Sequence, residues 1–191
     1  MVTFKHNCDL YHECLDLLQY CYEQIPVVGI PADLGFPCPL DIHATYTRAQ
    51  ILAALDFVED YSVSEGVKYF KAKKTDILFT TLNKSDKFYS PTTAYNDYSI
   101  SEWLFHWQSQ STTSDTSVTG TRYRTHTKMG NQILLFVRDR KSDRFGAQPF
   151  VFLGPVTYVQ HTGSRPMNIT WRMQHPIPAK YRKITNKLIT E

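Results

Sequence analysis

The stretch Met167-Asn168-Ile169-Thr170-Trp171-Arg172-Met173 alternates apolar and polar residues without a break. Successive side chains of a β-strand point to opposite sides of a sheet, so this alternation predicts a strand with one buried side and one side in water. The residues expected to face the core are Met167, Ile169, Trp171 and Met173, and those expected to face water are Asn168, Thr170, Arg172 and Gln174.

Further short segments rich in β-branched or aromatic residues predict more strands, with turn signals between them. They cover residues 67–71, 76–82, 132–138, 150–153 and 156–160. Many strands and few helices predict an α+β fold, in which a curved, mostly antiparallel β-barrel carries flanking helices and an N-terminal helical appendage.

Two helices are predicted ahead of these strands. Residues 9–23 place apolar side chains at positions 10, 14, 17, 18 and 21, which is one face of a helix. The second is predicted from Arg48 to about residue 60, because Thr47 and Gln50 have the spacing of a capping box. Its buried residues are expected to be Ile51, Leu52, Leu55 and Val58.

Between the two helices, residues 25–40 contain four prolines and two glycines, a composition that breaks regular structure and predicts a linker. We therefore expect residues 1–38 to form a helical appendage with its linker, and residues 39–191 to form the main domain.

The bulk composition narrows the class of protein. The sequence has no run of 18 apolar residues and its start lacks a signal-peptide pattern, so we expect a cytoplasmic protein with no membrane partner. The cysteines, at positions 8, 14, 21 and 38, form no Cys-x-x-Cys pair and are expected to be buried small hydrophobes. A zinc site from His6, Cys8 and His12 has irregular spacing and is the weaker alternative.

Charge is distributed unevenly although the net charge is only +3. Residues 1–95 hold 8 Lys+Arg and 12 Asp+Glu, a net −4, whereas residues 96–191 hold 13 Lys+Arg and 6 Asp+Glu, a net +7. The second half is therefore expected to attract polyanions. The alternative is a charged surface without a partner.

The segment 95–110 is dense in aromatic residues and histidine, with amides, hydroxyls and two carboxylates among them. A hydroxyl-rich stretch and then Arg122 and Arg124 follow it. Flat rings beside side-chain amides and guanidiniums suit a site that stacks on a base and holds nucleic-acid backbone nearby.

Enzymatic motifs give little support for catalysis. The chain lacks a P-loop, a Gly-x-Ser-x-Gly elbow and a His-Glu-x-x-His motif, and no cofactor or metal site is predicted. One nuclease-like pattern remains, because Asp139 and Lys141 follow an apolar strand as in some metal-dependent nucleases. The second metal ligand would have to be Asp97 or Asp115. A charged turn after the strand explains the same residues.

Six separated segments, in order, resemble the C-terminal domain found behind helicase motors in bacterial restriction proteins, over about residues 39–180. They read Pro39-Leu40-Asp41-Ile42-His43-Ala44-Thr45-Tyr46-Thr47-Arg48, Tyr95-Asn96-Asp97-Tyr98, Phe105-His106-Trp107-Gln108-Ser109-Gln110, Leu134-Leu135-Phe136-Val137-Arg138, Phe152-Leu153-Gly154 and Gly163-Ser164-Arg165-Pro166-Met167.

The resemblance implies a fold like the SET-and-RING-associated (SRA) or PUA-like domain, which flips 5-methylcytosine out of duplex DNA. The expected function is modified-cytosine recognition within a restriction system. The expected partners are double-stranded DNA with modified cytosine, and helicase and nuclease domains of the same polypeptide. The chain contains neither motor nor nuclease motifs, so it is expected to be no enzyme by itself.

A flipped base needs stacking rings, an acceptor for the cytosine N4 amine and nearby cations for phosphate. We predict Asp97 as the N4 acceptor, and core packing is the alternative for each predicted ring. The other pocket candidates are Tyr95, Tyr98, Trp103, Phe105, Trp107 and Tyr46. Gln108, Ser109 and Gln110 are candidates for contacting bases or filling the gap, with turn formation as the alternative. The phosphate candidates are Arg122, Arg124, Lys128, Arg138, Arg165 and Arg172.

Two other functions stay open on the sequence. A protein-interaction or dimerisation module of a helicase is one, and its best feature is the helix with Leu10, Leu17 and Leu18. A nuclease using Asp139 and Lys141 is the other. Within the binding hypothesis, RNA remains an alternative to DNA.

Overall fold

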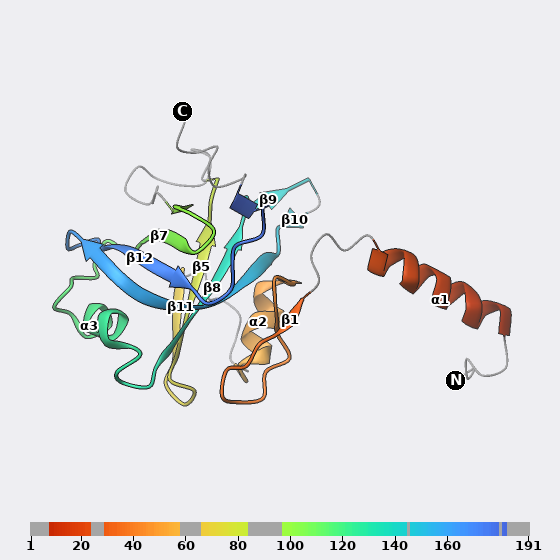
Figure 1. The fold of residues 1–191 in the computed structure, drawn as a ribbon, viewed down its shortest axis with the longest axis horizontal. Helices are drawn as coiled ribbons and strands as arrows, with labels where there is room; N and C mark the ends of the chain where they lie inside the picture. The colour runs from red at the N-terminus through yellow and green to blue at the C-terminus, as the bar shows by residue number, and fades with distance from the viewer. Residues whose placement is uncertain are drawn as a thin grey trace.

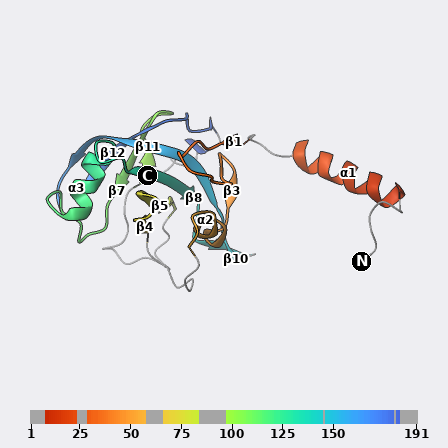
Figure 2. The ribbon, with the colours of Figure 1, turned by 90° about the horizontal axis from the view of Figure 1, so that it is seen from below.

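The computed structural model describes residues 8–23, 29–57, 66–83, 97–144, 146–179 and 181–182. Its centre is one curved eight-stranded sheet, drawn in Figures 1 and 2. The strand order is β4-β5-β8-β11-β12-β7-β6, and β3 pairs with β11 beside this path. The strands are β3 (Thr45–Tyr46), β4 (Val67–Phe70), β5 (Thr75–Thr81), β6 (Tyr98–Ser99), β7 (Leu104–Gln108), β8 (Gln132–Arg138), β11 (Phe150–Thr162) and β12 (Asn168–Met173).

The α+β class and the mostly antiparallel sheet are confirmed, with β5 and β8 as the one parallel pair in this sheet. The prediction of a barrel is wrong in one respect. In the described part of the chain, β4 and β6 are the two ends of the strand order and do not pair with each other. The sheet is therefore curved but open.

Strand β11 joins the two halves of the sheet. Its first residues pair with β8 and its later residues pair with β12, so a segment predicted as two short strands is one strand of 13 residues. The register shifts between Phe152 and Gly154 and again between Tyr158 and Gln160. Such irregularities bend a strand, and Gly154 takes a φ of 97° that favours glycine.

Two core clusters lie on the two sides of this sheet. One contains Trp107 and Trp171, and we call the side of the sheet that carries them the tryptophan side. The other contains Phe136 and Phe152 and is covered by helix α2 (Arg48–Ala54), whose Ile51 is fully buried.

The two halves of the sheet are covered differently. Strands β5, β8 and the first part of β11 are buried on both sides, and we call them the two-sided half. Strands β12, β7 and β6 bury the tryptophan side and leave alternate residues partly or fully exposed, and we call them the one-sided half. Met167, Ile169, Trp171 and Met173 are buried, as the alternation predicts.

The capping box is confirmed, because Gln50 N–H donates to the Thr47 hydroxyl while the Gln50 side chain accepts from Thr47 N–H. Helix α2 ends at Ala54, before the predicted residue 60. Ile51, Leu52 and Leu55 are buried as expected, and Val58 lies outside the described residues.

The predicted N-terminal helix is present as α1 (Cys8–Glu23), which Figure 1 shows apart from the sheet. It exposes its leucines, with Leu17 62% and Leu18 66% accessible. Cys14 and Cys38 are half-buried, so the expectation of buried thiols is not met at these two positions. None of the described helices has the length and apolar character needed to cross a bilayer.

The predicted linker includes residues that pack into the domain. Strand β1 (Ile30–Pro31) pairs with β2 (Asp41–Ile42), and Leu34 belongs to the cluster under α2. A second small hairpin joins β9 (Ser142–Asp143) and β10 (Gly146–Ala147). The division of the chain at residue 38 stays a prediction.

Helix α3 (Val118–Thr125) was not predicted from the sequence. Its segment contains a glycine, a valine and three threonines, which have weak helix propensity. The available signal is Ser117, whose hydroxyl accepts a hydrogen bond from Gly120 N–H as an N-cap. Tertiary contacts, described below, hold this helix.

Candidate nucleic-acid interface

The open side of the one-sided half forms a polar sheet surface. Tyr98 on β6 and His106 on β7 are cross-strand neighbours, and their rings stack with centroids 4.6 Å apart. Beside them, the Gln108 amide donates to the Asn168 Oδ1 at 3.0 Å. Arg172, on the same side of β12, is exposed. Ring, amide and guanidinium groups therefore share one accessible sheet surface.

The opposite side of the same strands is core. Phe105 is 0% and Trp107 is 4% exposed, so neither offers an open stacking face in this structure. Trp107 packs edge-on against Tyr123, with ring centroids 5.6 Å apart. For these two rings the core-packing alternative describes what is seen. Trp103 precedes β7, is 42% exposed, and donates its indole N–H to Glu102.

Asp97 lies at the edge of this region and is 5% exposed. Its Oδ1 accepts a hydrogen bond from Gln108 N–H at 2.9 Å. Because side chains alternate along a strand and Tyr98 faces the open side, Asp97 is expected on the tryptophan side, with Trp107. The carboxylate is thus held against the backbone of β7. Tyr95 lies outside the described residues.

Three more pocket and gap candidates have structural partners. Ser109 is fully buried. Its hydroxyl accepts a hydrogen bond from Met167 N–H at 2.9 Å, and its backbone N–H donates to the Met167 carbonyl oxygen. Gln110 O accepts from Thr113 N–H in a turn. These contacts fit the turn-forming alternative. Tyr46 accepts from Asp41 N–H and lies on β3, beside the two-sided half and away from Asp97.

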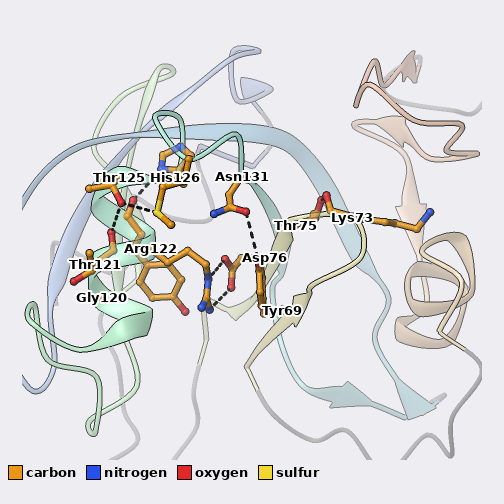
Figure 3. A network of polar contacts seen from close by, with 12 residues as sticks. Tyr69, Lys73, Thr75, Asp76, Gly120, Thr121, Arg122, Thr125, His126 and Asn131 are labelled. Carbon is orange, nitrogen blue, oxygen red and sulfur yellow. Dashed lines mark hydrogen bonds and ion pairs between the residues drawn. The ribbon is translucent and has the colours of Figure 1, made fainter.

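Arg122 is not available for phosphate in this structure, because it forms a buried ion pair with Asp76 (Figure 3). Its Nε and Nη2 donate to the two Asp76 oxygens at 2.7 and 2.9 Å. The guanidinium lies 3.9 Å from the ring centroid of Tyr69, whose hydroxyl donates to Asn131. The ion pair ties α3 to β5, and the contact of the guanidinium with Tyr69 ties it to β4.

The pKa values of this pair reflect burial and mutual charge. Burial raises the pKa of the Asp76 carboxyl, and the hydrogen bonds from Arg122 oppose that shift. Burial lowers the pKa of the Arg122 guanidinium, but the hydrogen bonds and charge of Asp76 outweigh burial and raise it overall. Two short charge-assisted bonds make this an ion pair. Asp76 was not singled out by sequence, since its partner is 46 residues away.

The remaining phosphate candidates fall into two groups. Arg124 donates to Asp115 O, and Arg138 donates to Thr81 and lies 4.4 Å from the Phe150 ring centroid. Both are therefore partly committed to the fold. The other three are exposed, and they are Lys128 after α3, Arg165 in the β11–β12 turn and Arg172 on β12.

Two hollows are present near polar groups. The larger, of about 400 Å³, is lined among others by His126, Asn131, Gln132, Gln174 and Leu34. The smaller, of about 270 Å³, includes Arg138, Asp139, Gln148 and Tyr181 around an apolar floor. Neither includes Asp97. Their lining residues come from distant parts of the sequence, which is why no local pattern predicted them.

The nuclease and metal alternatives gain nothing from the geometry. Asp139 accepts a hydrogen bond from Asn83 and pairs with Arg140 at 3.4 Å. Within the described ranges, no group of three or more His, Cys, Asp or Glu is placed to hold a metal ion. His6, named in the weaker zinc alternative, lies outside those ranges.

Comparisons with known proteins add the following. No curated protein matches the sequence. A crystal structure of the SUVH5 SRA domain in complex with methylated CHH DNA is similar at a TM-score of 0.47 and 11% identity, covering 80% of this chain and 99% of that one. The DNA recognition domain of the cytosine modification-dependent restriction endonuclease LpnPI is similar at a TM-score of 0.37 and 14% identity, covering 78% and 79%.

Because both TM-scores are below 0.5, neither likeness says what this chain binds. The family assignment is firmer, since a match over residues 40–184 covers most of the chain and includes the whole curved sheet. The chain belongs to the family described as Domain of unknown function (DUF3427).

Proposed function

We propose that this chain is a DNA-recognition domain that reads a modified cytosine, 5-methylcytosine or a related base, by flipping it out of the duplex. The supporting surface is the one-sided half of the sheet with its neighbouring loops. The cations Lys128, Arg165 and Arg172 are exposed, and residues 96–191, to which they belong, carry a net +7. Such a surface attracts the phosphate backbone whatever the base sequence.

The observation that carries the base-reading step is the position of Asp97. A carboxylate can accept from the cytosine N4 amine. Asp97 is 5% exposed and one of its oxygens is held by Gln108 N–H, so its orientation is fixed before any ligand arrives. A preset acceptor returns part of the few kcal/mol that extrusion of a base costs.

Neither hollow includes Asp97, so a base can reach this carboxylate only after a local opening of the structure. Asp97 and Trp107 are both nearly buried, so whatever covers them has to move. Trp107 then supplies a ring on which the base stacks, worth roughly 1–3 kcal/mol. An apolar neighbour of the 5-methyl group adds about 0.8 kcal/mol. The methyl preference is therefore expected to be modest compared with total affinity.

The test is fluorescence anisotropy at fixed salt with matched duplexes, one carrying 5-methylcytosine and one unmodified. The methylated duplex is expected to bind more tightly, and Asp97→Asn is expected to reduce that preference more than the total affinity. Asn keeps the side-chain volume and an oxygen for Gln108 N–H but adds a donor that opposes the N4 amine. Equal affinity for both duplexes would contradict the proposal, and a preference that survives Asp97→Asn would remove Asp97 from its role.

The alternative function is a protein-interaction module. Helix α1 exposes Leu10, Leu17 and Leu18, which places apolar side chains at the surface. This feature concerns the appendage, whereas the polar sheet surface and exposed cations belong to the family domain. The recognition role is therefore favoured for residues 40–184, with attachment to helicase and nuclease domains as part of the same proposal.

A further inference from the structure

Two loops far apart in sequence are joined at one end of the molecule, beside α3 in Figure 1. One is the hydroxyl-rich loop 111–117, and the other is the β11–β12 turn, residues 163–166. The Ser164 hydroxyl donates a hydrogen bond to Asp115 Oδ1 at 2.9 Å. In return, Asp115 N–H donates to the Ser164 hydroxyl oxygen at 3.4 Å. Arg165 N–H donates to Thr113 O at 3.2 Å. We call these two loops the loop pair.

The loop pair has a fixed base. Ser109 and Met167, which precede and follow its two loops, exchange two hydrogen bonds of 2.9 Å. Gly120 packs so closely on Ser114 that an added Cβ would lie 2.0 Å from the Ser114 carbonyl oxygen. Helix α3, which carries Gly120, is itself held to the sheet by the Arg122–Asp76 ion pair. The loops are therefore tied to the rigid part of the fold.

Arg165 is displayed by this arrangement in an uncommon backbone conformation. Its φ is 61°, in the left-handed region that residues with a side chain rarely adopt. Such a conformation persists when surrounding contacts determine it, and here the Arg165 N–H bond and the Ser164 bond flank it. The side chain is exposed. These hydrogen bonds therefore hold the backbone from which the exposed Arg165 side chain extends.

The Asp115 carboxylate, which accepts the hydrogen bond from Ser164, is a strong acceptor. The hydrogen bond from Ser164 lowers the pKa of Asp115 below its usual value. Asp115 therefore stays ionised at neutral pH, and the hydrogen bond between Ser164 and Asp115 is charge-assisted. The Asp115 carbonyl oxygen also accepts a hydrogen bond from the Arg124 guanidinium at 3.0 Å.

We infer that the loop pair is one preformed DNA-contacting unit, in which Arg165 contacts a phosphate and the Asp115–Ser164 hydrogen bond is the positioning element that orients it. This inference rests on the proposed function. A flexible arginine loses side-chain and loop freedom on binding, and a loop held in advance has less to lose. Ser164 and Asp115 then affect affinity without touching DNA.

The test uses the full chain and a methylated duplex, with affinity measured by anisotropy over a series of salt concentrations. The slope of the logarithm of the association constant against log salt is negative. Arg165→Ala is expected to reduce the magnitude of this slope by about 0.9, the value for one phosphate contact. Lys71→Ala, which removes the same charge from the exposed β4–β5 turn, is the control and is expected to change the slope less.

The positioning role is tested by Ser164→Ala, which leaves every charge in place. It is expected to weaken binding by roughly 2–10-fold, the entropy of ordering one long side chain, with an unchanged salt slope. Ser164→Thr keeps the hydroxyl and is expected to restore the affinity. Urea unfolding of each variant shows that the fold is intact.

The outcomes separate the two proposals. If the unaltered chain binds no DNA, the proposed function and this inference both fail. If it binds DNA but Arg165→Ala and Lys71→Ala have equal slopes, the loop pair is not a phosphate contact. If Arg165→Ala has the expected slope while Ser164→Ala binds like the unaltered chain, the positioning role of the Asp115–Ser164 hydrogen bond is refuted.

Discussion

The two-sided half and the one-sided half belong to one sheet but differ in how much of their surface is buried. Every residue of β5 is buried, including Asp76 at 1% exposure. In β7 and β12, buried residues alternate with partly or fully exposed ones, from Leu104 to Gln108 and from Asn168 to Met173. The difference is the cover on the side away from the tryptophans. Helix α2 packs on that side of the two-sided half, whereas alternate residues of β7 and β12 on that side stay partly or fully exposed.

If the proposed function is right, this difference separates the residues that stabilise the fold from those that contact DNA. A sheet covered on both sides has no surface to offer a partner, and its polar groups need internal partners. The half covered on one side keeps its core on the tryptophan side and leaves rings, amides and a guanidinium accessible. Substitutions in the two-sided half should therefore act on stability, and those on the open side of the one-sided half should act on binding.

The largest effect is expected from Asp76→Ala. It leaves the Arg122 guanidinium, whose side chain is 15% exposed, without its carboxylate partner. Breaking a buried ion pair by removing one partner costs about 3–5 kcal/mol. Urea unfolding followed by tryptophan fluorescence measures this loss.

A control for Asp76→Ala is the double substitution Asp76→Leu with Arg122→Met, which removes both charges and is expected to recover much of the stability. If Asp76→Ala lowers the free energy of unfolding by less than about 1 kcal/mol, within the range of an exposed pair, the ion pair is not the clamp that holds α3.

An intermediate effect is expected from Gly120→Ala, where α3 covers the tryptophan side. The new Cβ would meet the Ser114 carbonyl at 2.0 Å and the Met167 sulfur at 2.9 Å. Overpacking of this kind typically costs about 1–3 kcal/mol. Thermal or urea unfolding checks it against Thr119→Ala, a neighbouring position expected to change stability by about 0.5 kcal/mol or less. Equal stability of the two variants would show that α3 can move away from Ser114.

The smallest effect on stability is expected from Gln108→Ala, on the open side of the one-sided half. It removes the half-buried hydrogen bond to Asn168, worth about 0.5–1.5 kcal/mol at most. If this surface contacts DNA, the affinity should fall while the unfolding midpoint barely changes. A variant that loses stability and keeps its affinity would reverse the assignment of the two halves.

Much of the fold was predictable because its signals are local. The alternation of residues 167–173 predicted a strand and its buried side, and Thr47 with Gln50 predicted the start of α2. Helix α3 was missed because its residues have weak propensity and its stability comes from Asp76 and the core. The two predicted strands 150–153 and 156–160 are one, because a bulge at Gly154 lets the strand continue through Pro155.

The candidate site was predictable only in part. Segment 95–110 does place Tyr98 and His106 on an accessible surface, but alternation puts Phe105 and Trp107 in the core. Arg122 was expected on phosphate and instead pairs with Asp76. Which arginine is free depends on whether a carboxylate from another strand reaches it, and residue type does not reveal that.

The sequence by itself determined the period of each strand, the cap of α2 and the positive charge of residues 96–191, because these depend on neighbouring residues or on composition. Only the tertiary structure decided that the sheet stays open, that Arg122 of α3 pairs with Asp76 of β5, and that loops 111–117 and 163–166 meet. The ion pair and the loop contact join residues about 50 positions apart, and their free energy exists only once the chain has folded.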